Sequence, residues 1–383
     1  MAKIIVIGFA ALLAIGAAVF FYVLPARVDA RVNMVLPHDP YEVSAEAQRL
    51  HETLRVADLH ADTLLWMRNP ARRHQRGETD LPRLQAGGYR LQVFTAVTKA
   101  PRDMKLRGND ADSDRITLLM IAQRWPVRTW GSLAERALYQ ASRLERLQAD
   151  GGGAFKFVKT KNDLQSAMAS GALAGVMGAE GAHPLEGKIE NLDRLYDAGY
   201  RVLGLQHFFD NELGGSLHGI SGEGLTAFGR KAVAAAAAKS MIIDVAHSSE
   251  NVVRDVLALI DRPVIVSHTG FQGQCDSPRN ISDDLMRQVA AAGGLVGVGF
   301  WESAVCDATP AGIAAAIVYG VDLLGAEHVA LGSDFDGAVK TRLDATEIAA
   351  VTQALLDAGV DAQTIRLVMG ENAIRFFMEN LPD

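Results

Sequence analysis

The stretch MIIDVAHSSENVVRDVLALIDRPVIVSHTG, residues 241–270, contains a complete strand–helix–strand unit. Two short apolar runs, MIIDVAHS and PVIVSHTG, flank the amphipathic segment ENVVRDVLALI. Nearly continuous apolar runs of this length are typical of parallel strands that are buried on both faces. Each run also ends close to a histidine, His247 in the first and His268 in the second. The unit therefore predicts a parallel sheet with a pair of imidazoles at the carboxyl ends of its strands.

The same alternation extends along most of the chain. Apolar, β-rich runs occur at residues 55–62, 89–98, 173–181, 201–207, 241–248, 263–270, 295–301 and 328–337. Amphipathic segments lie between them, and some end in glycine, which is a common helix stop. Eight strands that alternate with helices predict an α/β fold, a (β/α)8 TIM barrel. A doubly wound open sheet is the alternative that the pattern leaves. Residues 99–172 are expected to be a helical insertion after the second strand.

Composition limits the classes of function. The chain has 383 residues, of which 49% are hydrophobic and 22% are charged, as is usual for a globular protein. The formal net charge is -7 and no long basic run occurs, so we expect no nucleic-acid partner. The two cysteines, Cys275 and Cys306, are too few for a disulfide framework, although one bridge remains open.

The N-terminal segment IIVIGFAALLAIGAAVFFYVL, residues 4–24, contains no charge and follows Lys3. Its length is sufficient to span a bilayer as a helix, whereas a cleaved signal peptide usually has a shorter apolar core. VDA, residues 28–30, leaves a cleaved signal peptide as the alternative. We expect residues 1–30 to anchor the protein in the membrane and residues 45–383 to form an exported barrel domain in the cell envelope.

Ionisable residues gather at the carboxyl ends of the predicted strands. They are His60, Asp62, Glu180, His207, His247, His268, Asp334 and Asp336. A single histidine at a strand end is more often structural, but burying so many of these groups together without partners is costly. Imidazoles and carboxylates suit zinc and similar ions, and (β/α)8 barrels place their chemistry at this rim. Three histidines, one aspartate and one glutamate are more ligands than one tetrahedral ion can bind, so we expect two ions that share Glu180.

The order of the motifs resembles that of one family. The motifs are DLHADT, GAEGAHPLE, RVLGLQH, GLTAFGR, IIDVAHSS, VIVSHTG, SPRNISDD and GSDFDG. Together they resemble the membrane dipeptidase (renal dipeptidase) family of zinc peptidases, within the metal-dependent hydrolase barrels, from about residue 45 to about 380. The resemblance implies that His60, Asp62 and Glu180 hold one zinc ion. It implies that Glu180, as the bridge, holds the second zinc ion with His247 and His268.

The resemblance also implies roles for three further residues. His207 would polarise the scissile carbonyl and stabilise the oxyanion, Arg279 in SPRN would hold the substrate's carboxylate, and Asp334 would handle protons or the substrate's free amine. From its sequence alone Arg279 could equally be a solvated surface residue. Asp336 shares a strand face with Asp334 but lies further into the loop, so it is the weaker candidate.

The resemblance implies a binuclear zinc dipeptidase that hydrolyses dipeptides by attack of a metal-bridging hydroxide, and the predicted two-ion site agrees with that chemistry. One alternative is a related barrel amidohydrolase acting on another amide or lactone. Many such barrels use a carbamylated lysine as the bridge, but RVLGLQH, residues 201–207, contains no lysine. The other alternative is a non-catalytic binding protein on the same fold, although no expected metal position is substituted. A homodimer is common in the family, and the sequence leaves both the oligomeric state and the side-chain preference open.

Overall fold

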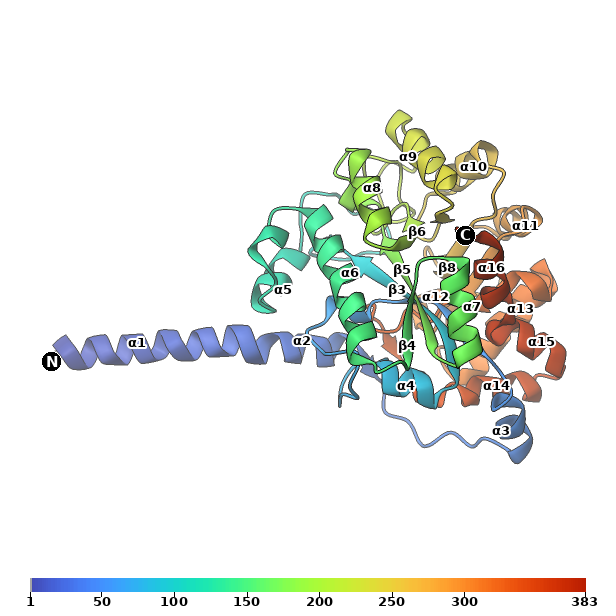
Figure 1. Ribbon diagram of the computed structural model, residues 1–383, viewed down its shortest axis with the longest axis horizontal. Helices are drawn as coiled ribbons and strands as arrows, with labels where there is room; N and C mark the ends of the chain where they lie inside the picture. Colours follow the sequence, from blue (N-terminus) through green and yellow to red (C-terminus); the bar gives the residue numbers. More distant parts are fainter. Residues whose placement is uncertain (1) are drawn as a thin grey trace.

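Eight parallel strands close into a barrel in the computed structural model, which describes residues 2–383 (Figure 1). The barrel strands are β2 (Val56–Ala61), β3 (Tyr89–Val97), β5 (Leu173–Glu180), β6 (Tyr200–Gly204), β7 (Ile242–Asp244), β8 (Ile265–Thr269), β9 (Leu295–Val298) and β10 (Val329–Leu331). The ring is closed because β3 pairs with both β2 and β5. Each of the eight apolar runs overlaps one of these strands, and only β6 begins outside its run, by one residue, so the (β/α)8 prediction is confirmed and the open-sheet alternative is wrong.

The insertion between β3 and β5 adds a strand to the expected helices. Its helices are α5 (Ile116–Ala122), α6 (Leu133–Asp150) and α7 (Lys161–Ser170). Strand β4 (Phe155–Val158) pairs with the first half of β5, and β6 pairs with the second half on the same edge. β4 therefore lies outside the closed ring. The sequence did not predict this strand.

Helices surround the barrel on its outer side (Figure 1). Those before β7 are α3 (Ala45–His51), α4 (Leu81–Ala86), α8 (Glu190–Asp197) and α9 (Ala227–Ala238). Those after β7 are α10 (Glu250–Leu259), α11 (Asp283–Ala291), α12 (Glu302–Val305), α13 (Pro310–Leu324), α14 (Ala349–Asp357), α15 (Ala362–Arg366) and α16 (Asn372–Asn380). Several begin at a hydroxyl cap: the side chains of Thr226, Ser249 and Thr309 accept backbone N–H groups of α9, α10 and α13.

Alternate side chains of β2 face opposite ways, one set toward the surrounding helices and the other toward the interior of the barrel. Ala57 and Leu59 are buried in a cluster with Phe376 and Phe377 of α16, between sheet and helix. His60 has the opposite orientation, because its ring contacts Ser267 of β8, and β8 is not a neighbour of β2 in the sheet. Successive strand residues point to opposite faces, so the polar residues of β2 face the interior of the barrel.

One long helix precedes the barrel. It contains α1 (Ala2–Ala18), the π-helical turn η1 (Val19–Val23) and α2 (Leu24–Val32), and it projects from the barrel as a single rod (Figure 1). Residues 3–32 are long and apolar enough to cross a membrane. Met1, the first residue of the expected 1–30 segment, lies outside the described residues. After the helix, β1 (Met34–Val35) pairs with β11 (Lys340–Thr341), so the connector follows the barrel surface.

The two cysteines form a disulfide between the loops that follow β8 and β9. Cys275 and Cys306 have Cα atoms 5.5 Å apart and are separated by 31 residues in the chain. The option of a single bridge, which the composition left open, is therefore the one that the structure adopts. Both loops lie at the rim where the strand ends converge, so the bridge connects two walls of the candidate site.

Candidate metal centre and active site

Glu180, the last residue of β5, lies at the centre of the polar cluster. Its Oε1 atom is 3.5 Å from His60 Nε2, 3.2 Å from His247 Nε2 and 3.4 Å from His268 Nε2. Its Oε2 atom is 3.5 Å from His207 Nε2. One carboxylate therefore contacts four imidazoles that come from four other strand ends. The central position expected for Glu180 is the one observed.

Asp62 lies just past the end of β2 and is oriented by the neighbouring strand. The Thr95 hydroxyl of β3 donates a 2.6 Å hydrogen bond to Asp62 Oδ1. The same oxygen is 3.8 Å from His60 Nε2. His60 and Asp62, two residues apart at the end of β2, therefore belong to one buried cluster. Thr95 was not predicted from the sequence, because nothing in its own segment marks it.

Ser267 orients two of the imidazoles. Its hydroxyl is 3.1 Å from His60 Nδ1 and 2.8 Å from His268 Nδ1. With Nδ1 held in this way, the Nε2 atoms of both rings face Glu180. A partner at the far nitrogen of this kind fixes the ring orientation of metal-binding histidines. Ser267 directly precedes His268 in the sequence, and this adjacency is the only signal that could have found it.

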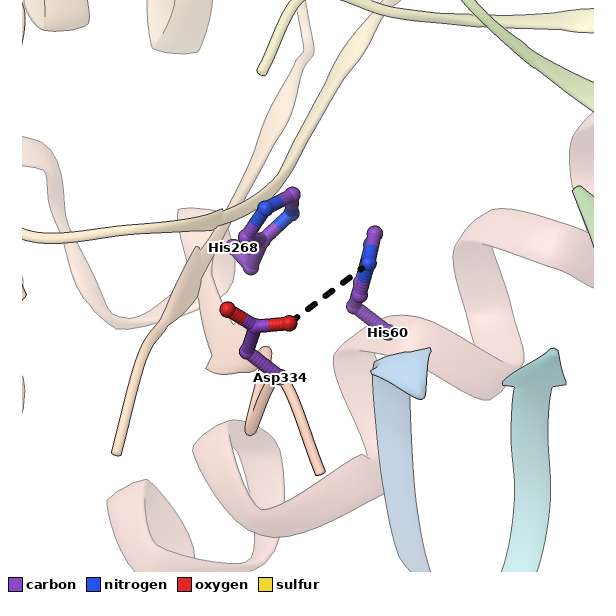
Figure 2. Close-up of side chains that lie close together, drawn as sticks. All are labelled: His60, His268 and Asp334. Carbon is purple, nitrogen blue, oxygen red and sulfur yellow. Dashed lines mark ion pairs between the residues drawn. The ribbon is translucent and has the colours of Figure 1, made fainter. Parts of the chain in front are cut away.

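Asp334 enters the cluster from the loop after β10. Figure 2 shows it facing His60 and His268, and its Oδ1 is 3.9 Å from His60 Nε2. Asp334 has a left-handed φ of 60°, a conformation that is unusual for a residue other than glycine. Asp336 does not face the cluster, since it pairs with Arg68 at 2.7 Å. The structure therefore brings Asp334 and not Asp336 to the candidate site.

The loops after β6 and β7 are joined behind His207 and His247. The Ser216 hydroxyl lies within hydrogen-bond distance of the backbone oxygens of both residues. His247 has a left-handed φ of 63°, and its backbone oxygen accepts a 2.7 Å hydrogen bond from Leu217 N. A strained conformation persists only where the surroundings hold it. These contacts therefore fix the direction in which the His247 ring points.

Arg279 is buried at the edge of the cluster. Its Nη2 donates a 2.6 Å hydrogen bond to the His268 backbone oxygen and is 3.4 Å from His247 Nε2. The guanidinium also stacks over the Trp301 ring, 5.4 Å from its centroid. Only 2% of Arg279 is exposed, so the alternative of a solvated surface residue is wrong. Burial lowers the pKa of Arg279 to about 10, which leaves it charged at neutral pH.

Burial sets the protonation of the cluster. It raises the pKa of Glu180 well above its usual value, with Asp62 and Asp334 adding like-charge repulsion. Burial also raises the pKa of Asp334 to about 8. Desolvation has the opposite effect on two imidazoles, because it lowers the pKa of His207 to about 4 and that of His247 well below its usual value. For His60 desolvation is outweighed by the hydrogen bond and charge of Asp62, so its pKa is raised. Neutral imidazoles are the form that binds metal, and a bound cation would favour the ionised carboxylates.

Three overlapping groups of side chains have the geometry to hold a metal ion. They are His60, Asp62 and Glu180; Glu180, His207 and His247; and His60, His268 and Asp334, all of them buried. In tetrahedral zinc, with bonds of about 2.1 Å, two ligand atoms on one ion are about 3.4 Å apart. The 3.2–3.5 Å separations around Glu180 Oε1 match that spacing. The residues present therefore fit one or more divalent ions.

Two further histidines lie behind this cluster. His183 stacks on Phe209 with ring centroids 4.5 Å apart, and burial lowers its pKa to about 3. His218 packs against His247 and Phe208, and its Nδ1 is 2.8 Å from the Leu106 backbone oxygen. Neither belongs to a group with ligand geometry among the described residues. Their aromatic contacts instead support the His207 and His247 loops.

Comparison with known proteins identifies the family. Residues 44–381 match the sequence model described as membrane dipeptidase (peptidase family M19). The chain belongs to the membrane dipeptidase family. The family assignment expected from the eight motifs is therefore confirmed over almost the same range of residues.

Individual relatives of this family member agree. It is 26% identical over 330 residues to the dipeptidase ataJ of Aspergillus terreus, covering 78% of this chain and 76% of that protein. A metallo peptidase from Rhodobacter sphaeroides, solved with a phosphinate mimic of the dipeptide L-Ala-D-Ala, matches with a TM-score of 0.71 and 26% identity. That match covers 86% of this chain and 99% of the other. The probable dipeptidase PvdM of Pseudomonas aeruginosa, at 20% identity and a TM-score of 0.73, shows the shared fold.

Family, fold and site together define the enzyme class. This membrane dipeptidase family member is a metal-dependent hydrolase of the dipeptidase type. The alternative of a non-catalytic binding protein loses its basis, because every expected ligand side chain is present and faces the same cluster.

Proposed function

We propose that this protein is a binuclear zinc dipeptidase in which Glu180 bridges the two ions. The observation that carries the proposal is the position of Glu180, whose carboxylate contacts four imidazoles at 3.2–3.5 Å. One ion would be held by His60 and Asp62 and the other by His247 and His268. The His247 and His268 Nε2 atoms lie 2.9 Å apart and both face Glu180 Oε1, at 3.2 and 3.4 Å, which supports a cation shared by these three side chains.

When bound, the ions would lower the pKa of a water between them and polarise the scissile carbonyl, so that a hydroxide attacks at neutral pH. The remaining steps belong to side chains of this chain. His207 lies beside Glu180 and is available to donate a hydrogen bond to the developing oxyanion. Asp334 Oδ1 lies 3.9 Å from His60 Nε2, and because a bound cation would favour its ionised form, Asp334 is suited to take a proton and return it to the leaving amine.

Recognition of both ends of a dipeptide follows from two buried charges. Arg279 offers a planar guanidinium that is suited to a substrate carboxylate, because its fork can form two parallel hydrogen bonds. Asp334 would also be the partner of the substrate's free amine. Both side chains are buried, at 2% and 7% exposed, so neither charge is screened by bulk water. A substrate with one charge at each end, and little chain between them, fits this arrangement.

We further propose that the N-terminal helix stays attached as a membrane anchor and that residues 45–383 form the exported domain. Asp29 supports retention, because it is buried and accepts hydrogen bonds from Arg68 at 2.9 Å and Arg76 at 2.8 Å. Cleavage after Ala30 would remove Asp29 and leave Arg68 with Asp336 as its only carboxylate partner. The disulfide supports an oxidising compartment such as the cell envelope.

A panel of dipeptides tests this function. Purified full-length protein with added zinc is incubated with L,L and L,D dipeptides, with the matched tripeptides and with simple lactones, and free amino acids or lactone opening are measured. We expect hydrolysis of dipeptides, loss of activity with a chelator and recovery with zinc. Lactone turnover without dipeptide turnover would overturn the proposal in favour of another barrel amidohydrolase.

A further inference from the structure

An apolar cavity leads directly to the candidate metal centre. It has a volume of about 250 Å³, and Asp62, Glu180 and His207 form its inner end. The outer walls are almost entirely apolar, and α5 supplies one of them through Ile116 and Leu119. A cavity that is continuous with the reacting groups is where a part of the substrate beyond the scissile bond would lie.

The opposite wall comes from the N-terminal helix. Phe20, Leu24, Pro25 and Val28 line the cavity, although they lie in or directly beside the apolar segment expected to cross the membrane. These residues are far from the barrel in sequence but adjacent to α5 in space (Figure 1). The segment assigned to anchoring therefore also borders the path to Glu180.

Polar contacts hold this wall in place. Asp29, one residue past Val28, is 2% exposed and bonded to Arg68 and Arg76. Arg68 in turn pairs with Asp336 in the loop that carries Asp334. About two turns closer to the N-terminus, the Arg124 guanidinium lies 4.3 Å from the centroid of the exposed Tyr22 ring. Removing one partner of a buried pair is costly, so the buried pairs of Arg68 with Asp29 and Asp336 fix the helix against the cavity.

Exposed apolar side chains continue from the cavity mouth. Beyond the N-terminal helix, the large exposed hydrophobic residues of the described chain are Met104, Leu118, Val127, Trp130 and Ile220. Three of them, Leu118, Val127 and Trp130, belong to α5 and the turn η3 (Val127–Thr129) with its flank, beside the helix. Trp at the edge of an apolar surface is typical of the membrane–water interface. The mouth therefore opens where the helix would leave the bilayer.

We propose that the N-terminal helix is a wall of the substrate pocket, and that this pocket binds an aliphatic group of the substrate at the membrane surface. The proposal rests on the dipeptidase function proposed above. The aliphatic group has two sources, a large side chain of a free dipeptide or an acyl chain on a dipeptide carried in the bilayer. Phe20 and Val28 are then specificity-determining residues, although they are remote from the chemistry.

Kinetics on a matched pair of substrates test the pocket. Full-length protein in detergent is assayed with Ala-Ala and with the two dipeptides in which norleucine replaces either alanine. Burying three extra methylenes should raise kcat/KM for one norleucyl dipeptide by about 4-fold per methylene, on the order of 50-fold in all. Phe20→Ala and Val28→Ala should reduce that gain several-fold, because they lower kcat/KM for the norleucyl dipeptide far more than for Ala-Ala. Val23→Ala, on the same helix but outside the cavity lining, is the matched control.

A binding measurement separates the pocket from the proposed function. The dissociation constants of Ala-Ala and of the norleucyl dipeptides are measured with metal-free protein, where no turnover occurs. If the protein hydrolyses none of these dipeptides, the proposed dipeptidase function is refuted, but the ratio of dissociation constants still tests the pocket. A lysyl dipeptide acylated on its side chain and carried in phosphatidylcholine vesicles separates the two sources. A gain with either substrate that depends on Phe20 and Val28 supports the proposal. The proposal is overturned if neither the norleucyl dipeptides nor the acylated lysyl dipeptide shows a gain over Ala-Ala. It is also overturned if Phe20→Ala and Val23→Ala reduce the gain equally.

Discussion

Arg279 is the residue that we propose to select the substrate by its carboxylate. Its guanidinium is held by the His268 backbone oxygen and by the Trp301 ring, and it is buried beside the imidazoles without being a candidate ligand. A fixed, desolvated cation next to a metal centre is suited to one carboxylate at one distance. Arg279 therefore determines substrate length in this account, and it does so independently of the metal ions.

Replacing Arg279 by methionine should lower kcat/KM for dipeptides strongly. Losing one partner of a desolvated charge pair costs about 2–5 kcal/mol, on the order of 30-fold to several-thousand-fold. Zinc content should be unchanged, and the gap between a dipeptide and its C-terminal amide should narrow, because the amide has no carboxylate to hold. Steady-state kinetics on that pair, with elemental analysis, make the measurement.

The matched control is Arg287→Met, which removes an exposed arginine of α11 that pairs only with Asp284 at the surface. We expect it to leave both substrates unaffected. If the wild type cleaves the amide as well as the acid, Arg279 is not the carboxylate clamp.

At the scale of single residues the sequence predicted the principal side chains and missed their supports. The carboxyl ends of parallel strands meet at one rim, so the convergence of His60, Glu180 and His268 follows from the fold. The Ser267 and Thr95 contacts do not follow, because each joins residues far apart in the sequence through a single hydroxyl. His60 and Ser267 are 207 positions apart, and no local pattern encodes such a pair.

Among the structural elements, the disulfide and the loops it joins matter most to the site. Cys275 lies in the loop that carries Arg279, and Cys306 follows α12, which begins directly after Trp301. The disulfide therefore joins the loop that carries Arg279 to the loop that carries Trp301, on whose ring the guanidinium stacks. Loosening one loop should displace the guanidinium from its position.

The double change Cys275→Ser and Cys306→Ser should lower the free energy of unfolding by roughly 3–4 kcal/mol, the chain-entropy value for a 31-residue separation. It should also raise KM for dipeptides while zinc content stays constant. Denaturant unfolding and kinetics measure the two effects. Reductant should reproduce both in the wild type and add nothing in the variant; an unchanged KM would show that the bridge does not position Arg279.

The elements themselves were largely predictable, because each barrel strand is an apolar run with a helix after it. β4 was the exception. Its four residues, FKFV, contain a lysine and lie in an insertion rich in helices, and the strand pairs outside the closed ring. A strand of that length has no periodicity to distinguish it, so only its pairing with β5 reveals it.

On the scale of the whole molecule, the N-terminal helix and the barrel are joined by buried charge. Asp29, Arg68 and Asp336 form a continuous series from the helix to the loop of Asp334. The helix spans 30 residues, or about 45 Å at 1.5 Å per residue, which exceeds the hydrocarbon core of a bilayer. The final turns are therefore free to pack on the barrel while the apolar part spans the membrane.

This arrangement predicts the topology of the full-length protein. An alkaline phosphatase fusion after Asp383 should be active, because the barrel is exported, and the fusion should sediment with membranes at its uncleaved mass. Asp29→Asn should leave the membrane association unchanged and lower the stability of the barrel, since it removes the carboxylate that Arg68 and Arg76 share and leaves Arg68 paired with Asp336 alone. A full-length protein recovered in the soluble cytoplasmic fraction would refute the anchor.

The most direct test of the central proposal is a zinc titration of metal-free protein, followed by bound zinc per chain and by dipeptide hydrolysis on the same samples. We predict that activity reaches its plateau only as the second ion binds. Glu180→Gln should hold neither ion tightly and show no turnover, whereas Glu190→Gln, an exposed glutamate at the start of α8, should behave as wild type. Full turnover at one ion per chain, or two tightly held ions with normal turnover in Glu180→Gln, would contradict the bridge.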